Sequence, residues 1–125
     1  MTIAQDREAF DRVARHLLTQ KARANQIAGE PACCYRARDG KRCAIGCLIA
    51  DEHYREDLEG CALLPSSDEA HPVIEALRRS GVQADIRLLA RLQTIHDRKP
   101  VNQWRKHLRR LRDEWFAKKK RSKTA

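Results

Sequence analysis

The sequence has few aromatic residues, no long apolar run and no signal-peptide pattern. Phe, Trp and Tyr make up 5% of the 125 residues and charged residues make up 34%, a balance that predicts a modest aliphatic core beneath a highly charged surface. No segment approaches the about 20 apolar residues of a transmembrane helix, and the first residues lack the apolar region of a signal peptide. We therefore expect a cytoplasmic protein that does not bind membranes.

The cysteines also lack the spacing of a redox-active pair, because no Cys-x-x-Cys motif is present. Five cysteines cannot all form pairs, and a reducing compartment does not keep disulfides. We expect reduced thiols that serve packing, metal binding or redox chemistry.

The positive charge is concentrated at the C-terminal end of the chain. From Val101 onward there are ten Lys or Arg against Asp113 and Glu114, a net of +8. Residues 1–100 carry sixteen bases and fifteen acids, a net of +1. The body of the protein is therefore nearly neutral, and the basicity belongs to the last helix and the end of the chain.

Apolar residues at helical spacing predict most of the secondary structure. The pattern favours an N-terminal helix over residues 5–21 and further helices over 72–81 and 84–97. A short acidic helix is expected over 51–58, before Gly60. One domain is expected over residues 1–117, because 125 residues suffice to bury roughly two-thirds of the unfolded surface in one core.

The last predicted helix follows Pro100 and has an unusually regular apolar seam. Its members recur at intervals of 3, 4, 3 and 4, and they are Val101, Trp104, Leu108, Leu111 and Trp115. The positions between them are mostly Arg and Lys, which predicts one buried and one basic face. Residues 118–125 have no apolar pattern, so we expect them to form a disordered basic tail.

The stretch 33–49 contains four of the five cysteines and the signal for a β-hairpin. Asp39-Gly40 between two short segments is typical of a two-residue type I′ turn. With Arg38 opposite Lys41, Arg36 faces Cys43, and Cys34 and Cys43 become diagonal neighbours on one face. Since a lone two-stranded ribbon is marginal in water, it must lie against the helices. The predicted fold class is therefore α+β, mostly α: an N-terminal helix, one central β-hairpin, and three to four helices ending in a basic amphipathic one.

Two motifs resemble a family of small uncharacterised bacterial and bacteriophage proteins. They are Tyr35-Arg36 to Asp39-Gly40 with Cys43-Ala44-Ile45-Gly46-Cys47-Leu48-Ile49, followed by Asp51-Glu52, Tyr54 and Glu59-Gly60, and later Leu92-Gln93 with Ile95-His96-Asp97 and Trp104. The resemblance spans roughly residues 5–115, with Ala50 where a proline is usual. It implies no activity, but it favours a protein that acts in a bacterial or infected host cell by binding another component.

Zinc is the alternative use of the cysteines. Cys34, Cys43 and Cys47 with His53 or Cys61 would form a tetrahedral site, although only the spacing of Cys43 and Cys47 fits a zinc knuckle. Small apolar packing explains the same residues. Arg36 and Arg42 flank the thiols and would lower their pKa, but a reactive thiol must also be exposed. We therefore predict no resident cofactor, with zinc as the alternative.

A hydrolytic site is not expected. His96 and Asp97 are adjacent on a helix, where their side chains point about 100° apart, so they should not form a dyad by themselves. His53, Asp51 and Glu52 add titratable groups without an evident metal geometry. His96 and Asp97 are expected to terminate their helix. The sequence therefore predicts a protein that is not an enzyme.

The charge partition favours a small basic protein that binds nucleic acid or a nucleoprotein complex, because Arg and Lys on one helix face can follow a phosphate backbone without reading bases. An acidic protein surface would satisfy the same charges. The alternatives are a phage or mobile-element inhibitor, of the anti-defence type, that blocks a host protein, and a zinc-stabilised structural module. The predicted contact residues are Arg105, Lys106, Arg109, Arg110, Arg112, Lys118, Lys119, Lys120 and Arg121, with a second patch of Arg36, Arg38, Lys41 and Arg42.

Overall fold

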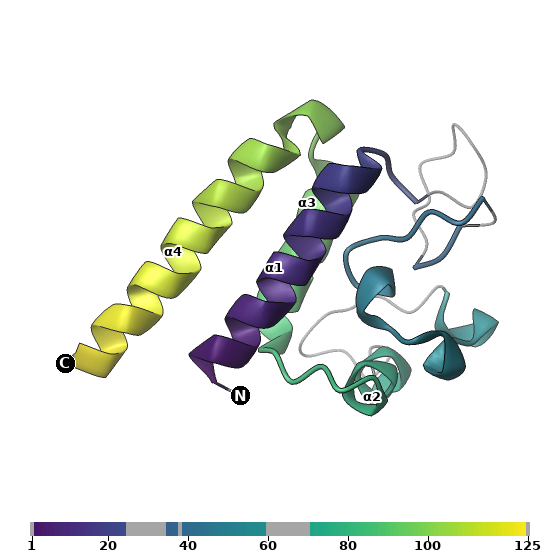
Figure 1. Ribbon diagram of the computed structural model, residues 1–125, viewed down its shortest axis with the longest axis horizontal. Coiled ribbons are helices and arrows are strands. Elements are labelled where there is room, and N and C mark those ends of the chain that lie inside the picture. Colours follow the sequence, from purple (N-terminus) through teal and green to yellow (C-terminus); the bar gives the residue numbers. More distant parts are fainter. Residues whose placement is uncertain (1, 25–34, 38, 60–70, 125) are drawn as a thin grey trace.

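The computed structural model describes residues 2–24, 35–37, 39–59 and 71–124, and the side chains of the last helix up to residue 117. The described part is mostly helical (Figure 1). Its α-helices are α1 (Ile3–Gln20), α2 (His71–Arg79), α3 (Ile86–Arg98) and α4 (Trp104–Thr124). Its short 3₁₀ helices are η1 (Gly46–Leu48), η2 (Asp51–His53), η3 (Glu56–Leu58) and η5 (Val101–Gln103).

Three of the helices pack against one another along their lengths. α1 and α4 run in opposite directions, α3 contacts both, and the segment 39–59 with α2 lies on the other side of α1 from α4 (Figure 1). The core between the helices is aliphatic, with Val13, Leu17, Leu88, Leu92 and Trp104 all fully buried. The expected aliphatic core is thus present, and one Trp lies at its centre.

α1 forms where the sequence predicts it. Thr2 caps its first turn, accepting a hydrogen bond from the Gln5 backbone N–H while the Gln5 side chain accepts from Thr2, a capping box. At the other end Lys21 adopts a left-handed conformation (φ 53°), and its N–H donates to Leu17 O. These caps place the helix within two residues of the predicted 5–21.

The predicted α+β fold is wrong, because the described residues contain no strand. Only an isolated antiparallel bridge joins Arg36 and Arg42. Asp39-Gly40 does form the turn, but Ala37 N–H donates to Lys41 O and Gly40 N–H donates to Ala37 O. That pattern, with Gly40 at φ 91°, is a three-residue loop with a bulge instead of a type I′ turn.

The longer loop also shifts the expected register by one residue. Cys43 N–H donates to Tyr35 O, so Cys43 pairs with Tyr35 and not with Arg36. A one-residue shift exchanges the two faces of a hairpin, and it leaves Ala37 and Cys43 buried on the core side. Cys33 and Cys34 lie outside the described residues.

Side chains take the place of a second strand beside the bridge. The Glu59 carboxylate accepts from the backbone N–H groups of Tyr35 and Arg36, at 2.9 and 3.1 Å. On the other segment Gln20 accepts from Arg42 N–H, and Arg42 O accepts from Gln20 and bonds to His16. The groups of Arg36 and Arg42 point away from each other at the bridge, so these side chains stand where further strands would pair. Glu59 also takes the Tyr35 N–H, with which the pairing would otherwise continue.

The apolar run after the bridge enters the core as predicted. Ile45, Leu48 and Ile49 are fully buried. Gly46 is required at the start of η1, because a Cβ there would collide with the backbone of Tyr35. The tight approach of these two segments therefore replaces the packing that strands would provide.

The predicted acidic helix over 51–58 is wrong as a continuous element. η2 and η3 are separate 3₁₀ turns, and Tyr54 and Arg55 between them are extended. The extended backbone lets the Tyr54 hydroxyl donate to Glu59 at 2.6 Å and places the Tyr54 ring 4.5 Å from the Arg36 guanidinium. These tertiary contacts outweigh the weak helical preference of so short a segment.

The remaining helices agree with the sequence patterns. α2, α3 and α4 match the segments expected from 72, 84 and 101, with Asp85 capping α3 by accepting from Arg87 N–H. The range of α4 extends past residue 117, into the stretch expected to form a tail. The side chains from 118 on lie outside the described part, and the tail stays a prediction.

Candidate nucleic-acid interface

The start of α4 is anchored by Trp104. Its indole is fully buried, and its Nε1–H donates to Lys99 O at 3.0 Å. The His96 ring of α3 stacks on it with a centroid distance of 5.6 Å. The short connection after Lys99 is thereby fixed, and α4 is held at one defined rotation about its axis.

The far end of the packed region is anchored by Phe116 and Trp115. Phe116 is buried edge-to-face against Phe10, with ring centroids 5.9 Å apart. The Trp115 Nε1–H donates to the buried carboxylate of Asp6 at 3.2 Å, and Asp6 also accepts from Asp85 N–H. α4 is therefore joined to α1 and to the start of α3, over three turns beyond Trp104.

The predicted apolar seam of α4 is confirmed, and it is wider than predicted. Trp104, Leu108 and Leu111 are buried, and Val101 and Trp115 pack against the core as half-buried residues. Phe116 was not part of the seam. The signal for it is its position eight residues after Leu108, which lies on the same stripe of a core-facing helix.

The cations of α4 lie on the exposed side of the helix. We call Arg105, Lys106, Arg109, Arg110 and Arg112 the α4 basic face. All five are exposed, and Lys106, Arg109 and Arg110 fall opposite the buried Leu108 and Leu111 at about 100° per residue. The predicted division into a buried and a basic side therefore holds for residues 104–117.

Most of the α4 basic face has no carboxylate partner. Arg112 Nε lies 3.5 Å from Asp113 Oδ1. No ion pair within 4.0 Å joins Arg105, Lys106, Arg109 or Arg110 to any carboxylate in the described part of the chain. The other predicted contact residues of this helix, Lys118, Lys119, Lys120 and Arg121, have side chains outside the described part.

A cleft between α3 and α4 adjoins the α4 basic face. It encloses about 270 Å³ and is lined by Arg91, Thr94, Ile95, Lys99, His107, Arg110 and Leu111. Arg91 forms an ion pair with Glu114 at 2.8 Å across its rim. Burial lowers the pKa of His107, as do the neighbouring charges of Lys99, Arg110 and Lys106. The cleft is therefore positively charged over an apolar floor.

The second predicted patch has different surroundings. Arg36, expected at the surface, is largely buried, and its guanidinium donates to Ile49 O and pairs with Asp51 at 2.8 Å. Arg42 pairs with the same Asp51, and Lys41 pairs with Asp39. Arg38 lies outside the described residues. The patch is also on the other side of α1 from α4 (Figure 1).

The described thiols point inward. Cys43 is fully buried and its Sγ accepts from Gly46 N–H, while the half-buried Cys47 donates to Ala44 O. Burial raises the pKa of Cys43 far above its usual value and that of Cys47 to about 12, although Arg12 and Arg42 act in the opposite direction on Cys47. Both thiols are therefore protonated at neutral pH, which disfavours nucleophilic chemistry.

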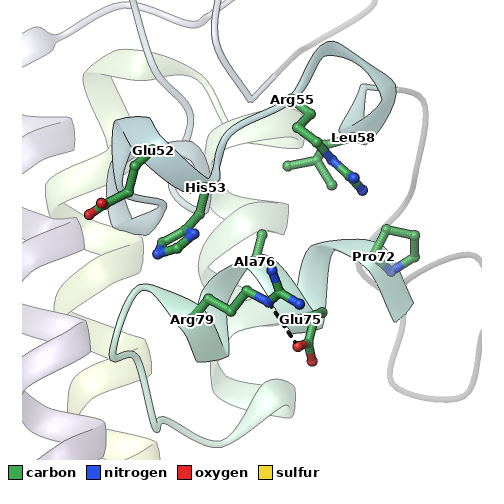
Figure 2. A pocket seen from close by; sticks show the side chains of 8 residues that line it. All are labelled: Glu52, His53, Arg55, Leu58, Pro72, Glu75, Ala76 and Arg79. Carbon is green, nitrogen blue, oxygen red and sulfur yellow. Dashed lines mark hydrogen bonds and ion pairs between the residues drawn. The ribbon is translucent and has the colours of Figure 1, made fainter.

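The described residues do not assemble a zinc site. His53 lies in a separate cleft between η2, η3 and α2 (Figure 2). No group of three His, Cys, Asp or Glu residues with metal-binding geometry occurs in the described ranges. Cys34 and Cys61, the other ligands considered, fall outside those ranges.

His96 and Asp97 are hydrogen-bonded, contrary to the expectation that neighbours on a helix stay apart. His96 Nδ1 lies 2.7 Å from Asp97 Oδ1, and Ala24 N–H donates to His96 Nε2 at 3.1 Å. Since a backbone N–H can only donate, Nε2 is the acceptor and Nδ1 carries the proton toward Asp97. The ring is fully buried with both nitrogens engaged, so it holds residues 23–24 against α3 and is not a base for substrates.

The cleft around His53 is a weak candidate for chemistry. It encloses about 350 Å³, but its charged groups largely compensate one another. Hydrogen bonds from Arg78 and Arg79 lower the pKa of Glu75 to about 2. Figure 2 shows the Glu75–Arg79 pair along α2 and Glu52 directed elsewhere. The two carboxylates therefore do not converge on one position.

Arg91, Lys99 and His107 were missed by sequence reasoning. Lys99 is the C-cap of α3 and His107 lies in the first turn of α4, and the short connection through Pro100 places the two helices beside each other as antiparallel neighbours. That signal would have brought the cations of α3 next to those of α4. Arg91 carries no such signal, because its position depends on the rotation of α3.

Comparison with known proteins adds no identity. The chain matches no protein-family model, no curated protein and no solved structure. Within the described part, none of the helices combines the length and hydropathy that crossing a bilayer requires.

Proposed function

We propose that this protein binds nucleic acid through the phosphate backbone, without catalysing a reaction, using the α4 basic face. The observation that carries the proposal is that Arg105, Lys106, Arg109 and Arg110 are exposed and have no carboxylate within 4.0 Å among the described residues. The opposite side of their helix is locked into the core. Guanidinium and ammonium groups held in this way gain most from a polyanion, because no ion pair has to be broken first.

The dimensions of the face suit a nucleic-acid backbone. Arg105 and Arg112 are seven residues apart, which is about 10 Å along a helix axis. Double-stranded DNA presents about six phosphate charges over that length. Five cations on one side of α4 therefore match the local charge density of a duplex. None of the described features reads base edges, so the binding is expected to be largely independent of sequence.

The test measures binding to a fluorescently labelled mixed-sequence DNA duplex and to an RNA of equal length. Fluorescence anisotropy gives the affinity for each at several salt concentrations. The triple variant Arg105→Gln, Arg109→Gln, Arg110→Gln should weaken binding at low salt by about tenfold or more for every sequence. It should also reduce the steepness of the salt dependence by about one for each lost cation.

A control triple variant removes the same charge elsewhere. Arg12, Arg15 and Arg55 are exposed, and the first two lie on the side of α1 turned away from its buried stripe. Their replacement by Gln lowers the formal charge equally from +9 and should leave most of the affinity.

Undetectable binding at low salt refutes the proposal, as does an equal loss in the two triple variants. In that case a pull-down from nuclease-treated bacterial lysate, compared between the wild type and the α4 triple variant, tests whether the face binds an acidic protein instead.

A further inference from the structure

The α3–α4 cleft combines features that the exposed arginines of α4 do not have. Its nitrogen donors come from two helices, Arg91 and Lys99 from α3 and its C-terminal end, and His107 and Arg110 from α4. Its volume of about 270 Å³ is several times the about 30 Å³ that a water molecule occupies in the liquid. Ile95 and Leu111 form an apolar floor under the charges.

We propose that this cleft is a binding site for a single phosphate group, with Lys99, His107 and Arg110 as its donors and Arg91 at its rim. The identification of that phosphate as part of a nucleic-acid backbone rests on the proposed function. A free phosphate would be bound by the same chemistry. The site goes beyond the α4 basic face, because it adds α3 and a titratable donor to the interface.

The charges on the cleft explain why an anion is favoured there. Lys99, Arg110 and Lys106 all act on His107, and the described residues that line the cleft include no carboxylate. Glu114 is connected to the cleft through its ion pair with Arg91. The pair that Glu114 forms with Arg91 is half-exposed, with 52% and 49% of the two side chains accessible, and such pairs contribute little. A phosphate that enters the cleft therefore replaces Glu114 as the partner of Arg91 at low cost. It also accepts hydrogen bonds from three further donors.

His107 gives the site a distinctive pH dependence. In the free protein its pKa is lowered by burial and by the cations Lys99, Arg110 and Lys106, so the ring is mostly neutral at pH 7. A bound phosphodiester introduces a negative charge and does not itself titrate in this range, so it raises the pKa of His107. Binding is then coupled to proton uptake and becomes tighter as the pH falls from about 8 to 5.5. The charged groups that act on His107 are Lys99 at the end of α3 and Lys106 and Arg110 on α4, and Arg91 of α3 lines the same cleft.

The test follows the His107 side-chain signals by NMR during titration with inorganic phosphate and, separately, with a short DNA duplex. Both ligands should shift the signals, and the duplex should raise the His107 pKa. The double variant Lys99→Gln, Arg110→Gln should abolish the response to phosphate. His107→Gln should remove most of the pH dependence of duplex affinity while the folded spectrum is retained.

A matched pair of neighbouring acids tests the rim. Glu114→Gln frees Arg91 and should tighten phosphate binding about fivefold, by the loss of one nearby negative charge. Asp113→Asn makes the same charge change on the exposed side of α4, away from the cleft, and should leave phosphate binding unchanged.

The outcomes separate this inference from the proposed function. If the duplex binds through the α4 basic face but neither ligand moves the His107 signals, the cleft is not a phosphate site and the proposed function stands. If phosphate shifts His107 and the duplex does not bind at all, the cleft holds free phosphate and the proposed function fails. Equal tightening by Glu114→Gln and Asp113→Asn also contradicts the site, since it shows only the effect of total charge.

Discussion

The cations of the two sides of this molecule differ in how they are neutralised. Between residues 35 and 79, each described Arg or Lys has a carboxylate oxygen within 3.3 Å, as Arg36 and Arg42 have in Asp51, and Arg78 and Arg79 in Glu75. On the α4 basic face, Arg112 alone has a carboxylate oxygen within 4.0 Å among the described residues. Both sides are rich in arginine, so composition does not distinguish them.

The role of a positively charged residue therefore depends on the groups that surround it. A paired arginine already has its electrostatic partner in the chain, and its role is explained by the fold. An exposed arginine held on a rigid helix without a partner raises the free energy of the folded state through repulsion with its neighbours. In the described part Arg12 and Arg15 of α1 also lack an ion pair, but α1 carries three arginines and three acids, a net of zero. Residues 104–117 of α4 carry five Arg or Lys and two acids, a net of +3.

The largest expected loss of stability comes from removing the side chain that anchors α4 in the core. Trp104→Ala removes a fully buried indole that packs on His96 and bonds to Lys99 O. We expect the free energy of unfolding to fall by about 3–5 kcal/mol, measured by urea denaturation with circular dichroism. Trp115→Ala, at a half-buried position, should cost less. A loss below about 1 kcal/mol for Trp104→Ala would show that α4 is not part of the cooperative core.

Arg36 and Arg42 both contact Asp51, so their contributions to stability can be compared directly. The Arg36 side chain is 17% exposed and also donates to Ile49 O, whereas the Arg42 side chain is 37% exposed. Arg36→Met should therefore lower the free energy of unfolding by about 1–3 kcal/mol, since it leaves the backbone oxygen of Ile49 without its donor. Arg42→Met should cost about 1 kcal/mol or less. Equal costs in urea denaturation would mean that the shared ion pair, and not burial, determines both.

Glu75 makes a smaller contribution to stability, and that contribution depends on pH. Its pKa is lowered from 4.5 to about 2 by Arg78 and Arg79. A carboxylate whose pKa is lower in the folded than in the unfolded protein stabilises the fold fully at pH values above its unfolded-state pKa. This contribution disappears as the pH falls from about 4.5 to 2. Glu75→Gln should flatten that part of the melting-temperature profile slightly, because the group is exposed and screened. Arg78→Gln with Arg79→Gln should flatten it equally, and an unchanged profile in both contradicts the pairing.

The parts of this fold that sequence reasoning predicts are those with a local cause. The ranges of α1 and α3, the seam through Trp104, Leu108 and Leu111, and the exposed position of the α4 basic face follow from spacing within one segment. The basic helix could be predicted to have two faces because 3.6-residue periodicity needs no knowledge of the partner.

The parts that were mispredicted depend on residues far away in the chain. The hairpin signal at Asp39-Gly40 predicted the turn correctly but not the strands, because Glu59 and Gln93 accept from the N–H groups of Tyr35 and Ile45, with which a ladder would continue. The cleft was missed because the rotation of α3, which brings Arg91 toward Glu114, is fixed by tertiary packing. Such contacts, at separations of 20 to 50 residues, leave no periodic signal.

The smallest expected stability change is the one that best distinguishes the two sides. The triple variant Arg105→Gln, Arg109→Gln, Arg110→Gln removes the like-charge neighbours 105/109 and 106/110, which are four residues apart on α4. Each such pair is destabilising by about 0.2–0.5 kcal/mol, and the opposite-charge neighbours 109/113 and 110/114, which the variant also loses, offset most of that gain. The remaining repulsion is small, so the variant should unfold at nearly the same urea concentration as the wild type. Salt screens this repulsion, so the difference should shrink at 1 M NaCl. A clear loss of stability would mean that these arginines support the fold, and the contrast with Arg36 and Arg42 would disappear.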